Sequence, residues 1–182
     1  IIRRADSWLK QKTARKVAFG GPALPTVDPV ARWRIAAELM PVIRGRISET
    51  LPKVGHFNDS PEVLEFVCSR DLETLAALGT SCPDHFLRTK IRPLVLHHDA
   101  KAGLIDIDRA LEAYRAGYAA YYERCKRANS PKLRDPNPVV FLVPGIGMIT
   151  FAADKATARI AGEFYVNAIN VMRGASSVDS YV

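Results

Sequence analysis

The segment from Val139 to Phe151 constrains the fold of this chain more than any other part of the sequence. It contains two apolar runs, Val139–Val143 and Met148–Phe151, separated by Pro144–Gly147. Apolar runs of this length bounded by proline and glycine predict buried strands, and the short connection predicts a hairpin. A hairpin requires antiparallel pairing, so the sheet that contains it is not purely parallel.

Strand and helix patterns alternate along the rest of the chain. Short apolar runs predict two further strands, at Lys53–Phe57 and Pro93–Leu96. Apolar residues at helical spacing predict helices over Pro29–Glu49, Ile107–Arg127 and Asp154–Met172. The alternation predicts an α/β fold, and within that class a three-layer α/β/α arrangement with a mixed central sheet.

Proline, serine and glycine mark the expected helix ends. Ser60, which precedes a proline, predicts the start of a short helix, because serine caps the first turn and proline fits the first helical position. Pro41 predicts a kink, and Gly174 predicts the end of the last helix. Leu75–Thr80 is compatible with a strand or with a helix end, and Thr80–Arg92 is expected to be a polar loop.

The helix expected over Ile107–Arg127 is rich in tyrosine. Its core-facing side is expected to carry Ile107, Leu111, Tyr114, Tyr118, Tyr121 or Tyr122, and Cys125. These tyrosines are therefore interpreted as core residues.

The chain length of 182 residues fits a single domain with irregular segments at its ends. Residues 1–27 combine a basic stretch with the Gly/Pro-rich joint Phe19–Pro25, which predicts an N-terminal arm and linker. Residues 28–175 are expected to form the α/β domain. Residues 176–182 are expected to begin a linker to a following domain.

The net charge of +7 favours anionic partners. Much of the excess lies in Ile1–Lys16 and Arg124–Arg134. Neither segment interleaves aromatic residues with its cations, as single-strand nucleic-acid surfaces do, so a nucleic-acid partner is disfavoured. A protein that handles sugar phosphates accounts for the charge equally well.

Cysteine usage and hydropathy bear on location. The three cysteines are far apart and form no CxxC pair, which favours a reducing, cytoplasmic environment. No apolar run reaches the roughly 18 residues that a membrane-spanning helix needs, so a membrane role is not expected.

Candidate binding residues gather in the polar segment after Gly79. Arg88 and Lys90 are separated by one residue, and on an extended segment their side chains would point to the same side and hold one anion. The adjacent Asp84 and His85 form a candidate acid/base pair. The competing interpretation is that the cations are solvated, or that Arg88 pairs with Asp84 and stabilises the loop.

His56 follows an expected strand and is a second candidate for the same site. The four histidines, which also include His85, His97 and His98, show neither HxH nor HExxH spacing, so no metal site is predicted. The turn at Pro144–Gly147 lacks the GxGxxG spacing of a dinucleotide site. No cofactor site is expected within the segment.

Three stretches resemble a known family: Val54–Ser60, Leu78–Lys90 and Ala161–Ala175. They look like the middle of the bifunctional rhamnulose-1-phosphate aldolase/short-chain alcohol dehydrogenase family. The resemblance implies a class II aldolase-type region before this segment and a short-chain dehydrogenase after it, with NAD and a divalent metal such as zinc used by the parent enzyme. It also leaves open whether the segment is a degenerate class II aldolase-like repeat or only an architectural likeness.

Two functions follow from this resemblance. The segment would contribute anionic-substrate binding to a sugar-phosphate aldolase/dehydrogenase of rhamnose-type catabolism. Alternatively, it would be a non-catalytic connector that docks and orients the flanking aldolase-type and dehydrogenase domains. Independent activity of the segment is not expected, and the sequence leaves self-association into a homo-oligomer open.

Overall fold

The computed structural model describes residues 1–13, 16–49, 51–99 and 101–181. Helices in these ranges are α1 (Ile2–Thr13), the short 3-10 helix η1 (Ala18–Gly20), α2 (Pro29–Ile47), α3 (Pro61–Val67), α4 (Leu72–Leu78), α5 (Pro83–Thr89), α6 (Ile107–Cys125) and α7 (Lys155–Val178). Strands are β1 (Val54–Asn58), β2 (Leu94–Val95), β3 (His98–Asp99), β4 (Gly103–Leu104), β5 (Val140–Val143) and β6 (Gly147–Ala152). No described helix is both long and apolar enough to cross a membrane.

The central sheet has the order β1-β6-β5-β2. β5 and β6 form the expected antiparallel hairpin, and β1 pairs antiparallel with β6. β2 pairs parallel with β5, with Leu94 opposite Phe141. The prediction of a mixed sheet is therefore confirmed.

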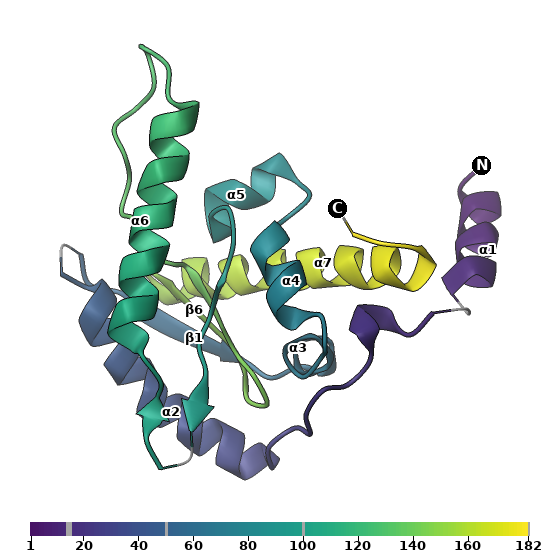
Figure 1. The fold of residues 1–182 in the computed structure, drawn as a ribbon, viewed down its shortest axis with the longest axis horizontal. Helices are drawn as coiled ribbons and strands as arrows, with labels where there is room; N and C mark the ends of the chain where they lie inside the picture. The colour runs from purple at the N-terminus through teal and green to yellow at the C-terminus, as the bar shows by residue number, and fades with distance from the viewer. Residues whose placement is uncertain (14–15, 50, 100, 182) are drawn as a thin grey trace.

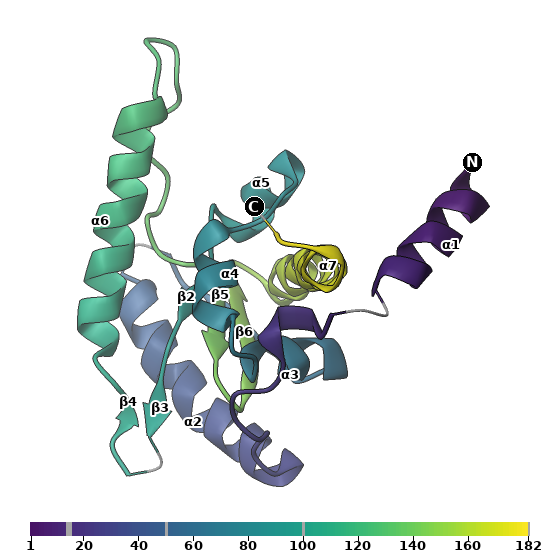
Figure 2. The same ribbon diagram turned by 45° about the vertical axis from the view of Figure 1, so that its right-hand side comes forward.

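Two layers of helices cover the sheet, so the three-layer α/β/α prediction is also confirmed (Figures 1 and 2). Along β5, Val140 and Leu142 belong to a core cluster with residues of α3, α4 and α7. The intervening Phe141 and Val143 belong to a second cluster with residues of α2 and α6. Because successive side chains of a strand point to opposite faces, this buried strand contributes to both cores.

Phe19, which lies in the range assigned to the arm and linker, is fully buried in the first of these cores. Its ring packs edge-on against Phe66, with ring centroids 5.1 Å apart. The backbone of Phe19 is left-handed, with φ of 55°. α1 lies outside the three layers, and Lys16 contacts Asp179 just after α7, with Nζ 3.4 Å from the carboxylate (Figure 1).

The polar loop expected at Thr80–Arg92 is wrong, because Pro83–Thr89 forms α5. Pro83 occupies the first helical turn, where its missing N–H is not needed. The density of polar groups predicts a loop, but on this short helix Asp84 and Arg88 face solvent, His85 is half-buried and Thr89 is buried. For Leu75–Thr80 the structure selects the helix-end alternative, since α4 ends at Leu78 and Gly79 follows with φ of 78°.

Two other helix ends differ in detail from expectation. Gly174 does not end α7, which continues for another turn to Val178, with the Ser177 hydroxyl donating to the Arg173 carbonyl over 2.6 Å. α2 runs through Pro41 as one helix, and the Asp28 carboxylate caps its first turn. Ser60 stands at the N-cap of α3 as predicted, but its side chain makes no capping bond there.

Candidate functional site

The structure places Arg88 and Lys90 at the end of a helix rather than on an extended segment. Arg88 lies in the last turn of α5, and Lys90 follows with φ of 63°. Arg88 is exposed on the helix, whereas Lys90, just beyond its end, is half-buried, so the two cations lie in different surroundings and the segment that carries them is not extended. The predicted arrangement, in which both cations face one anion from an extended chain, is wrong for that reason.

Lys90 is nevertheless held in an unusual environment. Its half-buried amine donates to the Asp135 carbonyl and lies 4.2 Å from the centroid of the Tyr118 ring. Burial lowers the pKa of Lys90 to about 8, and the nearby Lys53 and Arg134 act in the same direction. The amine is therefore still mostly protonated at neutral pH, but more weakly basic than a surface lysine.

A cavity of about 320 Å³ opens beside this amine and is called the tyrosine pocket here. Its walls combine aromatic rings, apolar side chains and cations: Phe86, Leu87, Lys90, Ile91, Tyr118, Tyr121, Tyr122, Pro131, Lys132, Arg134 and Val139. The rings of Tyr118 and Tyr121 are stacked, with centroids 6.3 Å apart and planes 29° apart. The pocket therefore offers flat apolar faces together with positive charge.

The loop after α6 brings Lys132 and Arg134 to the tyrosine pocket. The Tyr122 hydroxyl donates to the Pro131 carbonyl over 2.8 Å, which fastens the loop to the helix. Farther along, the Asp135 carboxylate accepts from the Lys53 amine over 2.6 Å. Burial opposes ionisation of Asp135, but the hydrogen bonds outweigh it and lower the pKa of this carboxyl.

The remaining predicted residues point elsewhere. His85 packs edge-on against Phe164 of α7, with ring centroids 5.1 Å apart. Asp84 and Arg88 are exposed, and within the described residues no ion pair joins them. The alternative that Arg88 stabilises the segment by pairing with Asp84 thus has no contact to support it.

His56 lies on β1 and interacts with the first turn of α7. Its Nδ1 is 3.2 Å from the Lys155 amine. Burial, followed by the positive charges of Lys155 and Arg159, lowers the pKa of His56. Its contacts are with α7 and not with the residues around Lys90.

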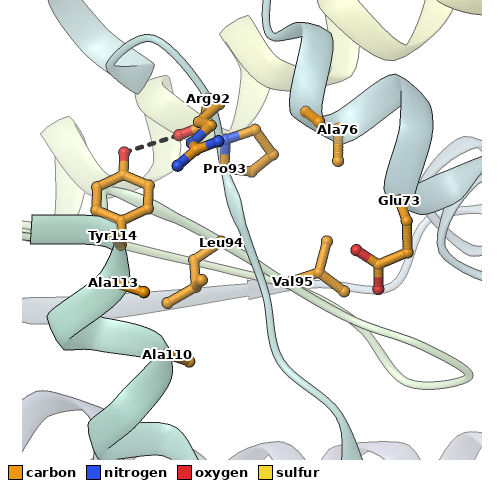
Figure 3. A pocket seen from close by; sticks show the side chains of 10 residues that line it. Glu73, Ala76, Arg92, Pro93, Leu94, Val95, Ala110, Ala113 and Tyr114 are labelled. Carbon is orange, nitrogen blue, oxygen red and sulfur yellow. Dashed lines mark hydrogen bonds between the residues drawn. The ribbon is translucent and has the colours of Figure 1, made fainter. Parts of the chain in front are cut away.

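A second cavity, of about 260 Å³, lies along β2 between α4 and α6 (Figure 3). It is lined mainly by small and apolar side chains, with Glu73 and Arg92 as its charged members. The Tyr114 hydroxyl donates to the Arg92 carbonyl over 2.8 Å, and burial raises the pKa of Tyr114. No residue predicted for the site lines this cavity.

Among the described residues, no group of three or more His, Cys, Asp or Glu side chains could hold a metal ion. The Pro144–Gly147 segment joins two strands of a hairpin rather than a strand and a helix. Its Gly145 carbonyl accepts from the Val27 amide over 2.9 Å, which ties the turn to the preceding segment. These donor sets fit neither a zinc ion nor a dinucleotide.

Sequence reasoning missed the tyrosines of the pocket. Tyr118, Tyr121 and Tyr122 were interpreted as core residues, yet they are only half-buried, and Cys125 is exposed. Only Tyr114 of this group is fully packed. The available signal was the combination of clustered tyrosines with the basic loop that follows them.

Comparison with known proteins gives two matches. A family described as aldolase class II, second domain, matches residues 34–182. The uncharacterized oxidoreductase YuxG of Bacillus subtilis (strain 168) is 32% identical over 187 residues, which cover 100% of this chain and 27% of that relative. The chain thus spans about a quarter of the relative's length, and no solved structure matches it.

Proposed function

Because this chain belongs to the family of class II aldolase second domains, we propose that it works as one domain of a longer aldolase/oxidoreductase polypeptide and binds an anionic sugar substrate in the tyrosine pocket. The family supports the aldolase part of the proposal. The name of the Bacillus relative supports the oxidoreductase part.

The observation that carries the proposal is the half-buried Lys90 amine at the face of Tyr118. Arg134 and Lys132 add positive charge to the same pocket. Cations hold a phosphate through charge-assisted hydrogen bonds, while the carbon face of a sugar packs against an aromatic ring. A phosphorylated sugar can make both contacts, with its phosphate on the cations and its ring on the tyrosines.

The type of substrate and the nature of the second enzyme domain follow from the resemblance of three stretches to the rhamnulose-1-phosphate aldolase/short-chain alcohol dehydrogenase family. These stretches are Val54–Ser60, Leu78–Lys90 and Ala161–Ala175. We infer a phosphorylated deoxy-sugar of the rhamnulose 1-phosphate type, a short-chain dehydrogenase elsewhere in the polypeptide, and a cytoplasmic location. The NAD and the divalent metal of such an enzyme would be held outside this chain, because its described residues offer no fitting donor set.

A connector without a ligand is the second candidate. It is favoured by the separation of the predicted residues, since His56 contacts Lys155 and His85 packs on Phe164. In that case the tyrosine pocket would bind no substrate at the substrate concentrations found in cells.

Calorimetric titration with rhamnulose 1-phosphate and with unphosphorylated rhamnulose separates these two functions. We expect micromolar-to-millimolar binding of the phosphate ester, at least about tenfold tighter than the free sugar, because a charge-assisted contact contributes ~1.5–3 kcal/mol. Lys90→Gln and Arg134→Gln should each weaken binding by about tenfold. Arg88→Gln, an exposed position on the neighbouring helix, is the matched control and should leave it within about twofold.

The pH dependence offers a second check. The bound anion needs the protonated Lys90 amine, whose pKa is lowered to about 8 in the free protein. Affinity should therefore be nearly constant between about pH 6.5 and 7.5 and fall as the pH rises through the lysine pKa, while below about pH 6 protonation of the phosphate itself weakens binding. No measurable binding of either the ester or the free sugar would instead favour the connector, and equal binding of both that is insensitive to Lys90→Gln would contradict the phosphate site.

A further inference from the structure

The outer edge of β2 is not used by the proposed function. β2 ends the sheet order and pairs only with β5. The Leu96 amide donates to the Leu142 carbonyl over 2.9 Å. Since the backbone groups of successive strand residues point to opposite sides, the N–H and C=O of Val95 face away from β5. In the described part of the chain, neither group has a hydrogen-bond partner.

A groove runs along this free edge. The cavity of about 260 Å³ and a neighbouring one of about 290 Å³ share the lining residues Val95, Ala110 and Ala113, so they adjoin each other. Figure 3 shows Ala76 on one side of the strand and Ala110 and Ala113 on the other. We call this combined space the edge groove.

The edge groove continues the plane of the sheet. α4 belongs to one helix layer and α6 to the other, and β2 lies between them. A further strand would lie about 4.8 Å beyond β2, between the same two helices. Ala76, Ala110 and Ala113 line this position with small side chains, beside the larger Glu73, Arg92 and Tyr114.

Val95, Ala110 and Ala113, which both cavities share, carry no charge, although Glu73, Arg92, Asp106 and Arg109 also line the edge groove. Exposed edges are commonly guarded by lysines, prolines or bulges. Here Pro93 limits one end, and at the other the His97 carbonyl accepts from the Ile105 amide over 3.0 Å. The free stretch is therefore short and centred on Val95.

A second copy of this chain is a poor occupant, because its own β2 is flanked by the same two helices and would meet them before the strands could pair. A single extended segment can enter between α4 and α6. The Bacillus relative is nearly four times as long as the matched region, so polypeptide outside this chain supplies such segments.

We propose that a short, mostly apolar extended segment of the longer polypeptide pairs with Val95 and adds a strand to the sheet in the edge groove. Its backbone would bond the free N–H and C=O, and its side chains would fill the two cavities. The inference rests on the proposed function only in placing this chain within a longer polypeptide.

Photo-crosslinking in the full-length polypeptide tests the proposal. p-Benzoylphenylalanine replaces Ala113 in the groove wall or, as the control, the exposed neighbouring Glu112, which lines neither cavity. We expect Ala113 to crosslink within one molecule to a single extended apolar segment outside this chain, at least about fivefold more than Glu112. Crosslinks between two copies, or yields equal to those of Glu112, would overturn it.

Hydrogen exchange of the Val95 amide gives an independent measurement. In the full-length polypeptide this amide should exchange at least about a hundredfold more slowly than in the 182-residue chain. Equal rates would reject strand pairing even if the groove is covered. Neither result depends on ligand binding, so loss of sugar-phosphate affinity in Lys90→Gln with no crosslink at Ala113 would reject the docking alone.

Discussion

The two edge strands of the central sheet, β1 and β2, differ in what lies against their backbones. β1 pairs with β6 over its full length, and the Lys155 amine donates to the Gly55 carbonyl over 3.1 Å. β2 is two residues long and leaves Val95 unbonded on its outer side within the described chain. A lysine thus sits on the backbone of one edge, whereas alanines flank the other.

Free space does not follow the same division. A Cβ added to Gly55 would overlap the end of the Met40 side chain and lie 3.0 Å from the Phe151 ring. A cavity of about 390 Å³ nevertheless adjoins these three residues, and two cavities adjoin β2. The comparison indicates that the lysine on the β1 backbone, rather than free volume, distinguishes the two edges.

Proline substitutions that remove an amide from the inner or the outer side of β2 have the largest expected effect on the free energy of unfolding. Leu96→Pro removes the amide that bonds Leu142 and a fully buried side chain, so we expect a loss of about 3–5 kcal/mol in the free energy of unfolding. Val95→Pro removes an amide with no partner and should cost less than about 1 kcal/mol. Denaturant unfolding measures both, and equal losses would mean that the outer side of β2 is not free.

Side-chain enlargement compares the two edges next. Gly55→Ala should destabilise the fold by about 1 kcal/mol, because the flexible end of Met40 can shift but the Phe151 ring must also give way slightly. Ala113→Leu extends into the edge groove and should change stability by no more than about 0.5 kcal/mol. Thermal unfolding at matched pH is sufficient, and a larger loss for Ala113→Leu would show that the groove is already filled.

Titration of His56 probes the charge at the β1 edge and has the smallest expected effect. Burial and then Lys155 and Arg159 lower its pKa below the ordinary value of 6.5. The folded chain therefore binds this proton more weakly than the unfolded chain, and stability falls as the pH is lowered through 6.5.

Lys155→Gln should raise the pKa of His56, as measured by NMR, and make the loss of stability on acidification smaller, while its onset stays near pH 6.5. Stability at neutral pH should change by less than about 0.5 kcal/mol, because the contact is solvent-exposed. An unchanged His56 pKa would show that burial alone sets it.

The core of the sheet was predictable because its signal is local. Val139–Val143 and Met148–Phe151 are continuous apolar runs around a tight turn, and the structure forms β5 and β6 there. The short α5 was missed because Asp84, His85 and Arg88 give it a polar composition, although Pro83 marks its start.

The site was harder to predict because its contacts join distant parts of the sequence. Lys90 was identified as a candidate, but its amine reaches Asp135 and Tyr118, and no local pattern encodes that meeting. The different surroundings of Arg88 and Lys90 follow from one local error, an extended segment expected where a helix forms. Tertiary contacts, not residue types, decide which candidates share a pocket.

The contact between Lys16 and Asp179 has a mechanical consequence for a polypeptide that continues on both sides. Chain entering the fold and chain leaving it pass through one place, so the domain is attached at a single pivot rather than at two opposite ends. Rotation of the domain about that point would move the tyrosine pocket and the edge groove together.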